Sequence, residues 1–339
     1  MKNYVVIPTY KEAENLRELL PLLKNFNVII VDDASNDGTV RICRGFKNVK
    51  LITRKNERGL ASAVLAGVKT ITDKQAKVVV MDADFQHDPA KVPEFFKSLS
   101  EYDFVYGSRK TLKMPFYRKI ISKTAESIVK VLIPKIREID DPMSGYFGFR
   151  LDRVNLKGIR PIGYKIMLGF IMNLNRKAKI KKIEYEFGER KFGNSKLSFN
   201  VMLDLLRQVL RLNDYRIITF GLVGLSGVFV NEAVAFLLHA YLPLYMVFIL
   251  SAEISILTNF ILNHNLTFKR RVRLRKALPR YNLVALAGLS INVSIALYLS
   301  LFTNYLLANF IGIIVAFAFN YALSELFAWK NSTIYADRI

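Results

Sequence analysis

The chain has 339 residues, enough for about two domains, and 52% of them are hydrophobic. Its 50 Lys and Arg against 28 Asp and Glu give a formal net charge of +22, which suits an anionic membrane surface or phosphorylated substrates. Cys43 is the only cysteine, which excludes an intramolecular disulfide and a cysteine-based metal site. No zinc-finger spacing or aromatic-interleaved basic strand supports nucleic-acid binding, so no nucleic-acid partner is expected.

The first 110 residues alternate short apolar strands with helices, and this alternation predicts a parallel, doubly wound α/β sheet. We expect helices from about Glu12 to Asn25, after Thr39 and near Leu60–Ile71. The expected strands are Tyr4–Ile7, Val28–Val31, Val49–Thr53, Val78–Met81 and Phe104–Gly107. The apolar run before Pro8 is too short for a signal peptide, so this domain is expected to stay in the cytoplasm. There is no G-x-G-x-x-G after the first strand and no P-loop, so an ordinary dinucleotide or ATPase site is not expected.

Two amphipathic segments follow. Leu112–Ile136 mixes apolar and basic residues at helical spacing, and two interpretations stay open: a helix on an anionic membrane surface, or a core helix with a solvated face. Phe199–Leu212 places apolar residues on one face and is interpreted as a bridge from the first domain to the bilayer.

Four apolar segments then predict four membrane spans, each about long enough to cross a ~30 Å hydrocarbon core. They are Ile217–His239, Leu244–Leu266, Tyr281–Phe302 and Tyr305–Trp329. The basic run Lys269–Lys276, with Arg280, lies between the second and third spans and is expected to be cytoplasmic, which places the first domain and both termini on that side. The expected domains are 1–197 (catalytic), 198–216 (interface helix and linker), 217–330 (membrane) and 331–339 (tail).

Two acids mark a metal site in the first domain. Asp82 and Asp84 directly follow an expected buried strand, and in extended backbone their side chains would point the same way. Ligands of open α/β sheets bind beyond the carboxyl ends of strands, and oxygen ligands suit Mg²⁺ or Mn²⁺. Gln86 is a further oxygen donor, whereas His87 is interpreted as structural. The alternative is a pair of solvated loop acids.

Motifs spread over about 200 residues carry a resemblance. They are Pro8-Thr9-Tyr10-Lys11-Glu12 with Asn15, Val31-Asp32-Asp33 with Asp37-Gly38-Thr39, Asp82–Pro89, Gly107-Ser108-Arg109, Asp141–Gly145 and Arg190–Lys196. In this order they resemble the inverting family-2 glycosyltransferases of the GT-A (Rossmann-like) fold, and among them the polyprenyl-phosphate sugar synthases such as the dolichol-phosphate mannose synthases. The spans resemble the GtrA-like four-helix membrane domain through Asn259-Phe260, Asn263-His264 and Thr267-Phe268, so the fold class expected is an α/β GT-A domain followed by an all-α membrane domain.

The resemblance implies site residues. The nucleotide sugar is expected at Pro8, Tyr10, Glu12, Asp33, Asp82, Ala83, Asp84, Arg190 and Lys196. The metal, Mg²⁺ or Mn²⁺, is expected at Asp82, Asp84 and Gln86. The acceptor phosphate is expected at Arg109, Arg118, Ser122, Lys123 and Ser195. The catalytic set is Asp82, Asp84, Arg109 and Asp141, where Asp141 either contacts the sugar or holds the acceptor loop. Asp37 and Gly38 are interpreted as turn residues.

The implied reaction is inverting transfer of mannose from GDP-mannose to dolichyl (polyprenyl) phosphate at the cytoplasmic membrane face. The lipid phosphate is already anionic, since its second pKa is about 6, so no general base is needed. UDP-glucose is the alternative donor. A more distant alternative function is a lipid-sugar flippase, because Glu232, Glu253 and Glu325 lie within the spans and acids within a membrane often have a functional role. The bilayer is the expected partner; no obligatory protein partner is expected, and homo-oligomers through the spans are possible. Two departures limit the resemblance: Gly169 stands where the family usually has a glutamate, and the acceptor segment lacks paired glycines.

Overall fold

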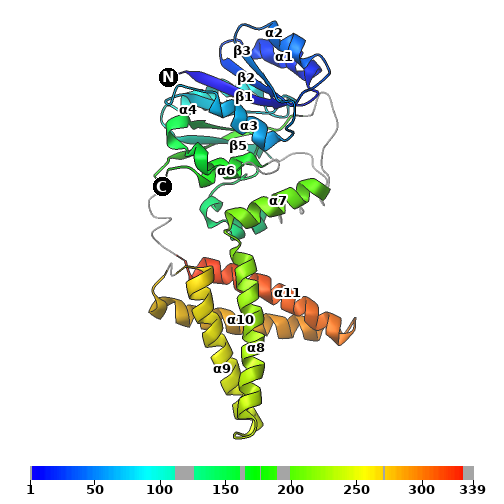
Figure 1. The fold of residues 1–339 in the computed structure, drawn as a ribbon, viewed down its shortest axis with the longest axis vertical. Coiled ribbons are helices and arrows are strands. Elements are labelled where there is room, and N and C mark those ends of the chain that lie inside the picture. The colour runs from blue at the N-terminus through cyan, green and yellow to red at the C-terminus, as the bar shows by residue number, and fades with distance from the viewer. Residues whose placement is uncertain are drawn as a thin grey trace. The chain divides into compact units, whose positions relative to one another are not determined.

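The structure is a computed structural model that describes residues 2–110, 126–160, 165–175, 177–188, 199–269 and 272–330. The chain folds as two compact units (Figure 1). The sheet unit comprises Met1–Lys130 and Lys135–Leu212, and the helical unit comprises Val131–Pro134 and Asn213–Ala336. A four-residue piece from the middle of the sheet unit's sequence therefore belongs to the helical unit. The boundary between the units, after Leu212, falls within the range 198–216 that the sequence analysis assigns to an interface helix and linker.

The sheet unit is built on seven strands in the order β3-β2-β1-β4-β6-β5-β7. The strands are β1 (Asn3–Thr9), β2 (Asn27–Asp32), β3 (Val49–Thr53), β4 (Lys77–Val80), β5 (Phe104–Lys110), β6 (Phe147–Arg150) and β7 (Ile180–Glu186). β6 runs antiparallel to both of its neighbours, while the other pairs are parallel. The doubly wound sheet is confirmed, but β6 and β7 were not predicted, and β5 extends three residues beyond its expected end.

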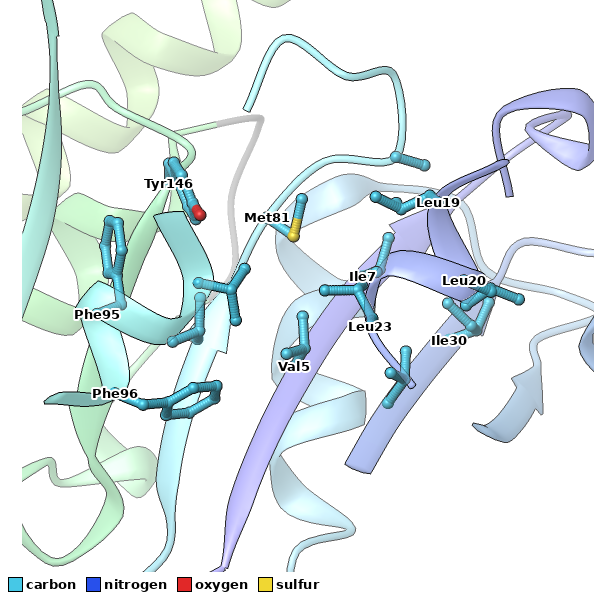
Figure 2. Close-up of a cluster of buried hydrophobic side chains, with 14 of the residues drawn as sticks. Val5, Ile7, Leu19, Leu20, Leu23, Ile30, Met81, Phe95, Phe96 and Tyr146 are labelled. Atoms are coloured by element: carbon cyan, nitrogen blue, oxygen red, sulfur yellow. The ribbon is translucent and has the colours of Figure 1, made fainter. Parts of the chain in front are cut away.

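Helices cover both faces of the sheet. They are α1 (Ala13–Leu22), α2 (Thr39–Arg44), α3 (Leu60–Lys69), α4 (Val92–Ser98) and α6 (Ile166–Met172); α7 (Phe199–Leu212) follows at the end of the sheet unit. Side chains alternate between the faces along each strand. On one face Val5 and Ile7 pack with residues of α1 and α4 such as Leu19 and Phe95 (Figure 2). On the other, Val6 lies against Gly67 of α3, where a Cβ would come within 2.8 Å of the valine.

The helical unit contains four helices that are long and apolar enough to cross a membrane, by length and composition. They are α8 (Arg216–Leu238), α9 (Leu244–Leu262), α10 (Leu274–Ser300) and α11 (Tyr305–Leu323), with α9 and α11 continuing as π-helical turns over Asn263–Thr267 and Ser324–Ala328. The third apolar helix extends beyond the expected span at its N-terminal end. Helix α10 begins at Leu274, so the second half of the basic run is its first turn.

The two helical hairpins repeat each other at a shift of 61 residues, from Leu244 at the start of α9 to Tyr305 at the start of α11. The π-helical turns begin at Asn263 and Ser324, at the same shift. The buried positions also coincide: Arg216, Phe220, Val223 and Gly227 in α8, and Ala277, Tyr281, Val284 and Gly288 in α10. In each hairpin the last of these positions is a glycine, and an asparagine side-chain amide lies where a Cβ on that glycine would be. Asn259 lies against Gly227, and Asn320 lies against Gly288.

Aromatic contacts within each hairpin are equivalent, and one further contact joins the two hairpins. Phe220 meets Phe268 edge-on at 6.2 Å, and their counterparts Tyr281 and Trp329 meet edge-on at 5.4 Å. Phe268 and Trp329 are themselves counterparts and stack on each other with centroids 4.2 Å apart. A contact between equivalent residues straddles a two-fold axis. The two hairpins are therefore related as internal repeats about this axis.

Candidate active site

Six strands and one reversed strand bring polar residues to a single edge of the sheet. The strands that end at this edge are β1, β2, β3, β4, β5 and β7. β4 and β5 share a direction because β6, which lies between them, is antiparallel to both. β6 begins there instead, with Phe147 opposite Val80 of β4 and Tyr106 of β5. The loop before β6, Asp141–Gly145, therefore meets the loop after β4 that carries Asp82 and Asp84. This meeting depends on the antiparallel strand that the sequence did not predict.

A buried ion pair organises the part of the edge beyond β2 and β3. Nε of Arg54 donates to Oδ1 of Asp33 over 2.7 Å, and Nη2 of Arg54 also contacts that oxygen. The backbone N–H of Gly59 donates to the other oxygen, Oδ2, over 2.9 Å. Gly59 has φ of +148°, which favours glycine. Asp33 thus fixes the 54–59 loop. Arg54 was missed from the sequence because its partner is 21 positions away.

The loop after β1 lies beside this pair. The Arg58 guanidinium carbon is 4.7 Å from the centre of the Tyr10 ring, which suits a cation–π contact. Glu12 accepts from the Asn15 amide over 2.6 Å. Asp37 accepts from the backbone N–H groups of Ala13 and Thr39, so the turn interpretation of Asp37 is confirmed.

The acidic loop after β4 is not extended. The strand ends at Val80, and Phe85 has φ of +63°, so the chain turns sharply within the motif. Asp84 is buried and Asp82 is partly exposed, with 35% of its side-chain surface accessible. The expected extended backbone is therefore not present through the whole motif, because the chain bends from Ala83 onward. Ala83 is buried in the core beneath the loop.

His87 holds the acidic loop in place. Its Nδ1 accepts from the backbone N–H of Asp82 over 2.9 Å, so in the neutral ring the proton is on Nε2. The ring stacks on Tyr146 at 5.0 Å, and burial lowers the pKa of His87 to about 4. A Cβ at Gly145 would lie 3.0 Å from Cε1 of His87 and 3.3 Å from Oδ2 of Asp82. The glycine therefore lets the 141–145 loop pack directly on the acidic loop.

The acidic loop fits a divalent cation shared with a substrate. Within the described residues no group of three or more His, Cys, Asp and Glu is arranged to hold a metal ion. Mg²⁺ usually takes one or two carboxylates and completes its shell with waters and substrate phosphates. Asp82 and Asp84 supply that number of carboxylates at the sheet edge. Gln86 is held through its backbone, where its N–H donates to Asp84 and its carbonyl accepts from Gly188.

A cationic group faces the acidic loop. Arg109, at the end of β5, binds Asp141 in a bidentate pair with Nε–Oδ2 of 2.7 Å and Nη2–Oδ1 of 3.0 Å. Burial opposes the charge of Arg109, but the hydrogen bonds that it donates to Asp141, together with the negative charge of that carboxylate, outweigh burial and raise the pKa of Arg109. The pair occupies two of the five guanidinium N–H donors, and among the described residues no further acceptor is bonded to the other three, which can therefore meet an anion. Asp141 therefore positions the guanidinium, whose carbon lies 5.3 Å from the Phe187 ring centre.

Lys165 is a second cation of this group that the sequence analysis did not select. Its Nζ donates to the carbonyl of Met143 over 3.2 Å. Burial, and then the neighbouring Arg109, lower its pKa, while the carboxylates of Asp141 and Asp82 favour its charge. Lys165 lies directly after the Gly163-Tyr164 pair, a position that the motif pattern alone did not mark as functional. Several expected site residues lie outside the described residues: Arg118, Ser122, Lys123, Arg190, Ser195 and Lys196.

Comparison with known proteins places this site in a family. Residues 4–154 match the family "Glycosyl transferase family 2", and residues 219–329 match "GtrA/DPMS, transmembrane domain". A dolichol-phosphate mannosyltransferase from Pyrococcus furiosus is 36% identical, over 98% of this chain and 100% of that protein. A dolichol-phosphate mannosyltransferase from Saccharomyces cerevisiae is 33% identical over 72% of this chain and 98% of its own length. An undecaprenyl-phosphate mannosyltransferase from Micrococcus luteus is 30% identical over 62% of this chain and 93% of its length.

Proposed function

The chain belongs to glycosyl transferase family 2, and we propose that this membrane-bound glycosyltransferase moves mannose from GDP-mannose to a polyprenyl phosphate. The observation that carries the proposal is the meeting of two charged groups at one sheet edge: the acidic loop with Asp82 and Asp84, and the cationic group of Arg109 and Lys165. The relatives support mannose as the sugar and a polyprenyl phosphate as the acceptor, because their names state both.

The acidic side of the edge suits the donor. A bound Mg²⁺ or Mn²⁺ would neutralise the charge that develops on a diphosphate leaving group. Asp82 and Asp84 would hold the ion, and the loops around Tyr10 and Asp33 border the place for the nucleoside. His87 keeps the backbone of the acidic loop fixed, so the carboxylates need little reorganisation during the reaction.

The cationic side suits the acceptor. A lipid phosphate oxygen attacks the anomeric carbon of mannose, the bond from that carbon to the GDP oxygen breaks, and its electron pair leaves with GDP. The products are a β-linked mannosyl phosphate lipid and GDP, with inversion of configuration. No proton moves in this step. The free N–H groups of Arg109 orient the phosphate, as guanidinium donors commonly do, and Asp141 keeps the guanidinium in place.

The helical unit holds the enzyme in the bilayer. Four apolar helices of this kind would anchor the enzyme in the membrane that holds the lipid acceptor, and anchoring raises the effective concentration of the acceptor. We assign the sheet unit and both termini to the cytoplasmic side. The support is the cluster of basic residues that joins the two hairpins, among them Lys269, Arg273 and Arg275.

To test the proposal, the detergent-solubilised protein would be given undecaprenyl phosphate and Mn²⁺ with either labelled GDP-mannose or labelled UDP-glucose. We expect mannosyl lipid from GDP-mannose only, abolished by chelation. Asp84→Asn should lose nearly all of this activity. Asp88→Asn is the matched control, because it makes the same chemical change in the same loop at a side chain that caps Ala90. Transfer from UDP-glucose would overturn the donor assignment, and no lipid product from either donor would overturn the function.

A further inference from the structure

A buried glutamine on helix α7 reaches the active site. Gln208 is 2% exposed and lies on the buried face of α7, next to Val209 and one turn from Leu205 and Leu212. Its Nε2 donates to the backbone carbonyl of Lys165 over 2.9 Å, whereas its Oε1 has no hydrogen-bond partner among the described residues. Because a buried amide costs free energy unless it is fully hydrogen-bonded, packing alone would favour an apolar residue at this position.

The backbone of Lys165 depends on this bond, because helix α6 does not hold it firmly. Lys165 is the N-cap of α6, and its φ of −100° and ψ of 57° are not helical. Its carbonyl also accepts from the backbone N–H of Leu168, over the longer distance of 3.3 Å. The bond from Gln208 is the shorter of the two and comes from a residue 43 positions away. It therefore fixes the direction of the peptide next to the Lys165 side chain.

The side chain of Lys165 carries this restraint into the site. Its Nζ donates to the carbonyl of Met143, in the same loop as Asp141. The ammonium group is close enough to Asp141, Asp82 and Arg109 to feel the charge of each. A shift of the Lys165 backbone would therefore move a cation that faces both the acidic loop and Arg109.

We propose that Gln208 is a positioning residue for the acceptor, because it holds Lys165 where its ammonium group and the guanidinium of Arg109 bind one lipid phosphate together. The inference rests on the proposed function and adds a residue that touches neither substrate. An ammonium group is a point charge on a flexible stem, so its place depends on what restrains the stem and the nitrogen. Gln208 restrains the backbone, and the carbonyl of Met143 restrains the nitrogen. Without Gln208, one phosphate would no longer meet both cations in their best positions.

A second amide bond to the same helix provides a matched control. Asn173, the C-cap of α6, donates from Nδ2 to the carbonyl of Gly169 over 2.9 Å. Gln208→Met and Asn173→Leu each replace an amide by an apolar side chain of similar shape, and each removes one bond to α6, at its N-terminal or its C-terminal end. The full-length variants in detergent would be compared for the Kd of undecaprenyl phosphate, with GDP and Mn²⁺ present, and for the KM of GDP-mannose. Thermal melts would show whether each variant is folded.

Gln208→Met should raise the Kd of undecaprenyl phosphate by about 3- to 10-fold, which is the worth of one hydrogen bond, and change the KM of GDP-mannose by less than about 2-fold. Asn173→Leu should change neither constant. Lys165→Met tests the route: if Gln208 acts through Lys165, adding Gln208→Met to Lys165→Met should change the Kd by less than about 2-fold. Gln208→Asn, whose amide is one methylene shorter, carries the same test if Gln208→Met does not fold.

Three results would overturn the inference. They are equal effects of Gln208→Met and Asn173→Leu, a rise in the KM of GDP-mannose as large as the rise in the Kd of undecaprenyl phosphate, and an effect of Gln208→Met that is as large with Lys165→Met as without it. Each of them, in a protein whose wild type forms mannosyl lipid, leaves the proposed function in place. A wild-type protein that forms no mannosyl lipid would instead overturn the proposed function.

Discussion

Removal of the Arg54 side chain tests whether the buried ion pair with Asp33 organises the nucleotide side of the site. Both side chains are 8% exposed, and Arg54 also donates to Ser62 over 2.8 Å and to the carbonyl of Gly59 over 3.1 Å. Arg54→Met keeps the length of the side chain but leaves the Asp33 carboxylate buried without its cation. Breaking a buried pair in this way costs about 3–5 kcal/mol. For a domain of about 150–250 residues, each kcal/mol lowers Tm by roughly 2–4 °C, so we expect a fall of about 6–20 °C.

The chain offers a separate reporter for each unit. Cys43, the only cysteine, is 2% exposed within the sheet core, and burial, with a smaller contribution from Asp32, raises the pKa of its thiol to about 11. A thiol-reactive fluorophore at pH 7.5 therefore labels the protein only when the sheet unit opens. Trp329, the only tryptophan, is buried in the helical unit, and its fluorescence follows that unit.

We expect Arg54→Met to lower the thiol-reported transition and to leave the tryptophan-reported transition in place. Asp33→Asn combined with Arg54→Met removes the uncompensated charge and should recover part of the loss. Lys91→Met, in an exposed pair with Glu94, is the control and should cost less than about 1 kcal/mol. If the thiol-reported Tm of Arg54→Met lies within about 2 °C of that of Lys91→Met, the reasoning that the Arg54–Asp33 pair holds the 54–59 loop is refuted.

Two further predictions concern one contact in each unit. Arg109→Lys keeps the positive charge but loses the bidentate geometry with Asp141. In steady-state kinetics the rate of sugar transfer should therefore fall by about 10- to 100-fold, with the donor KM little changed. Activity equal to that of the wild type would contradict a positioning role for the pair. Gly227→Ala places a Cβ into the Asn259 amide and should destabilise the helical unit by about 1–3 kcal/mol in the tryptophan-reported transition, whereas Gly224→Ala, in open space on the same helix, should be neutral.

Local patterns were sufficient to predict much of the fold. The strands before β4 are short apolar runs that end in polar motif residues, and each was placed within a few positions of its observed bounds. Helix α7 was predicted with its observed ends, Phe199 and Leu212. These elements depend on periodicity and on residues close in sequence, which a single chain displays directly.

Pairing between distant residues was not predictable in the same way. β6 is only four residues long, Phe147–Arg150, and nothing in its sequence shows that it lies antiparallel between β4 and β5. That insertion is what brings Asp141 and Gly145 to the acidic loop. His264 is likewise buried by a distant partner, because its Nδ1 accepts from Nε1 of Trp329 over 3.2 Å.

The 61-residue repeat, in contrast, was readable from the sequence. Gly227 and Asn259 recur as Gly288 and Asn320 with identical spacing. The similarity is carried by few identical residues, so a motif-by-motif comparison with families does not reveal it. A self-comparison of the apolar half of the chain would have shown it.

Substitution of His87 tests whether the acceptor is a phosphate, because histidine is the residue type that most often transfers protons in catalysis. Transfer to a hydroxyl requires a base, whereas transfer to a phosphate anion does not. His87 is the obvious base by residue type, but its Nδ1 already accepts from the Asp82 backbone, and its ring lies against Tyr146. Asn places its side-chain oxygen close to the position of Nδ1 and can accept the same hydrogen bond, but it cannot take a proton near neutral pH.

His87→Asn should therefore retain at least about a tenth of the wild-type transfer rate, while His87→Leu, which leaves the Asp82 N–H without an acceptor, should lose far more. Rates would be measured at saturating donor and acceptor, with the thiol-reported transition confirming that both variants are folded. If His87→Asn is as inactive as His87→Leu although both are folded, His87 takes part in proton transfer, and the acceptor would have to be a group that loses a proton rather than a phosphate.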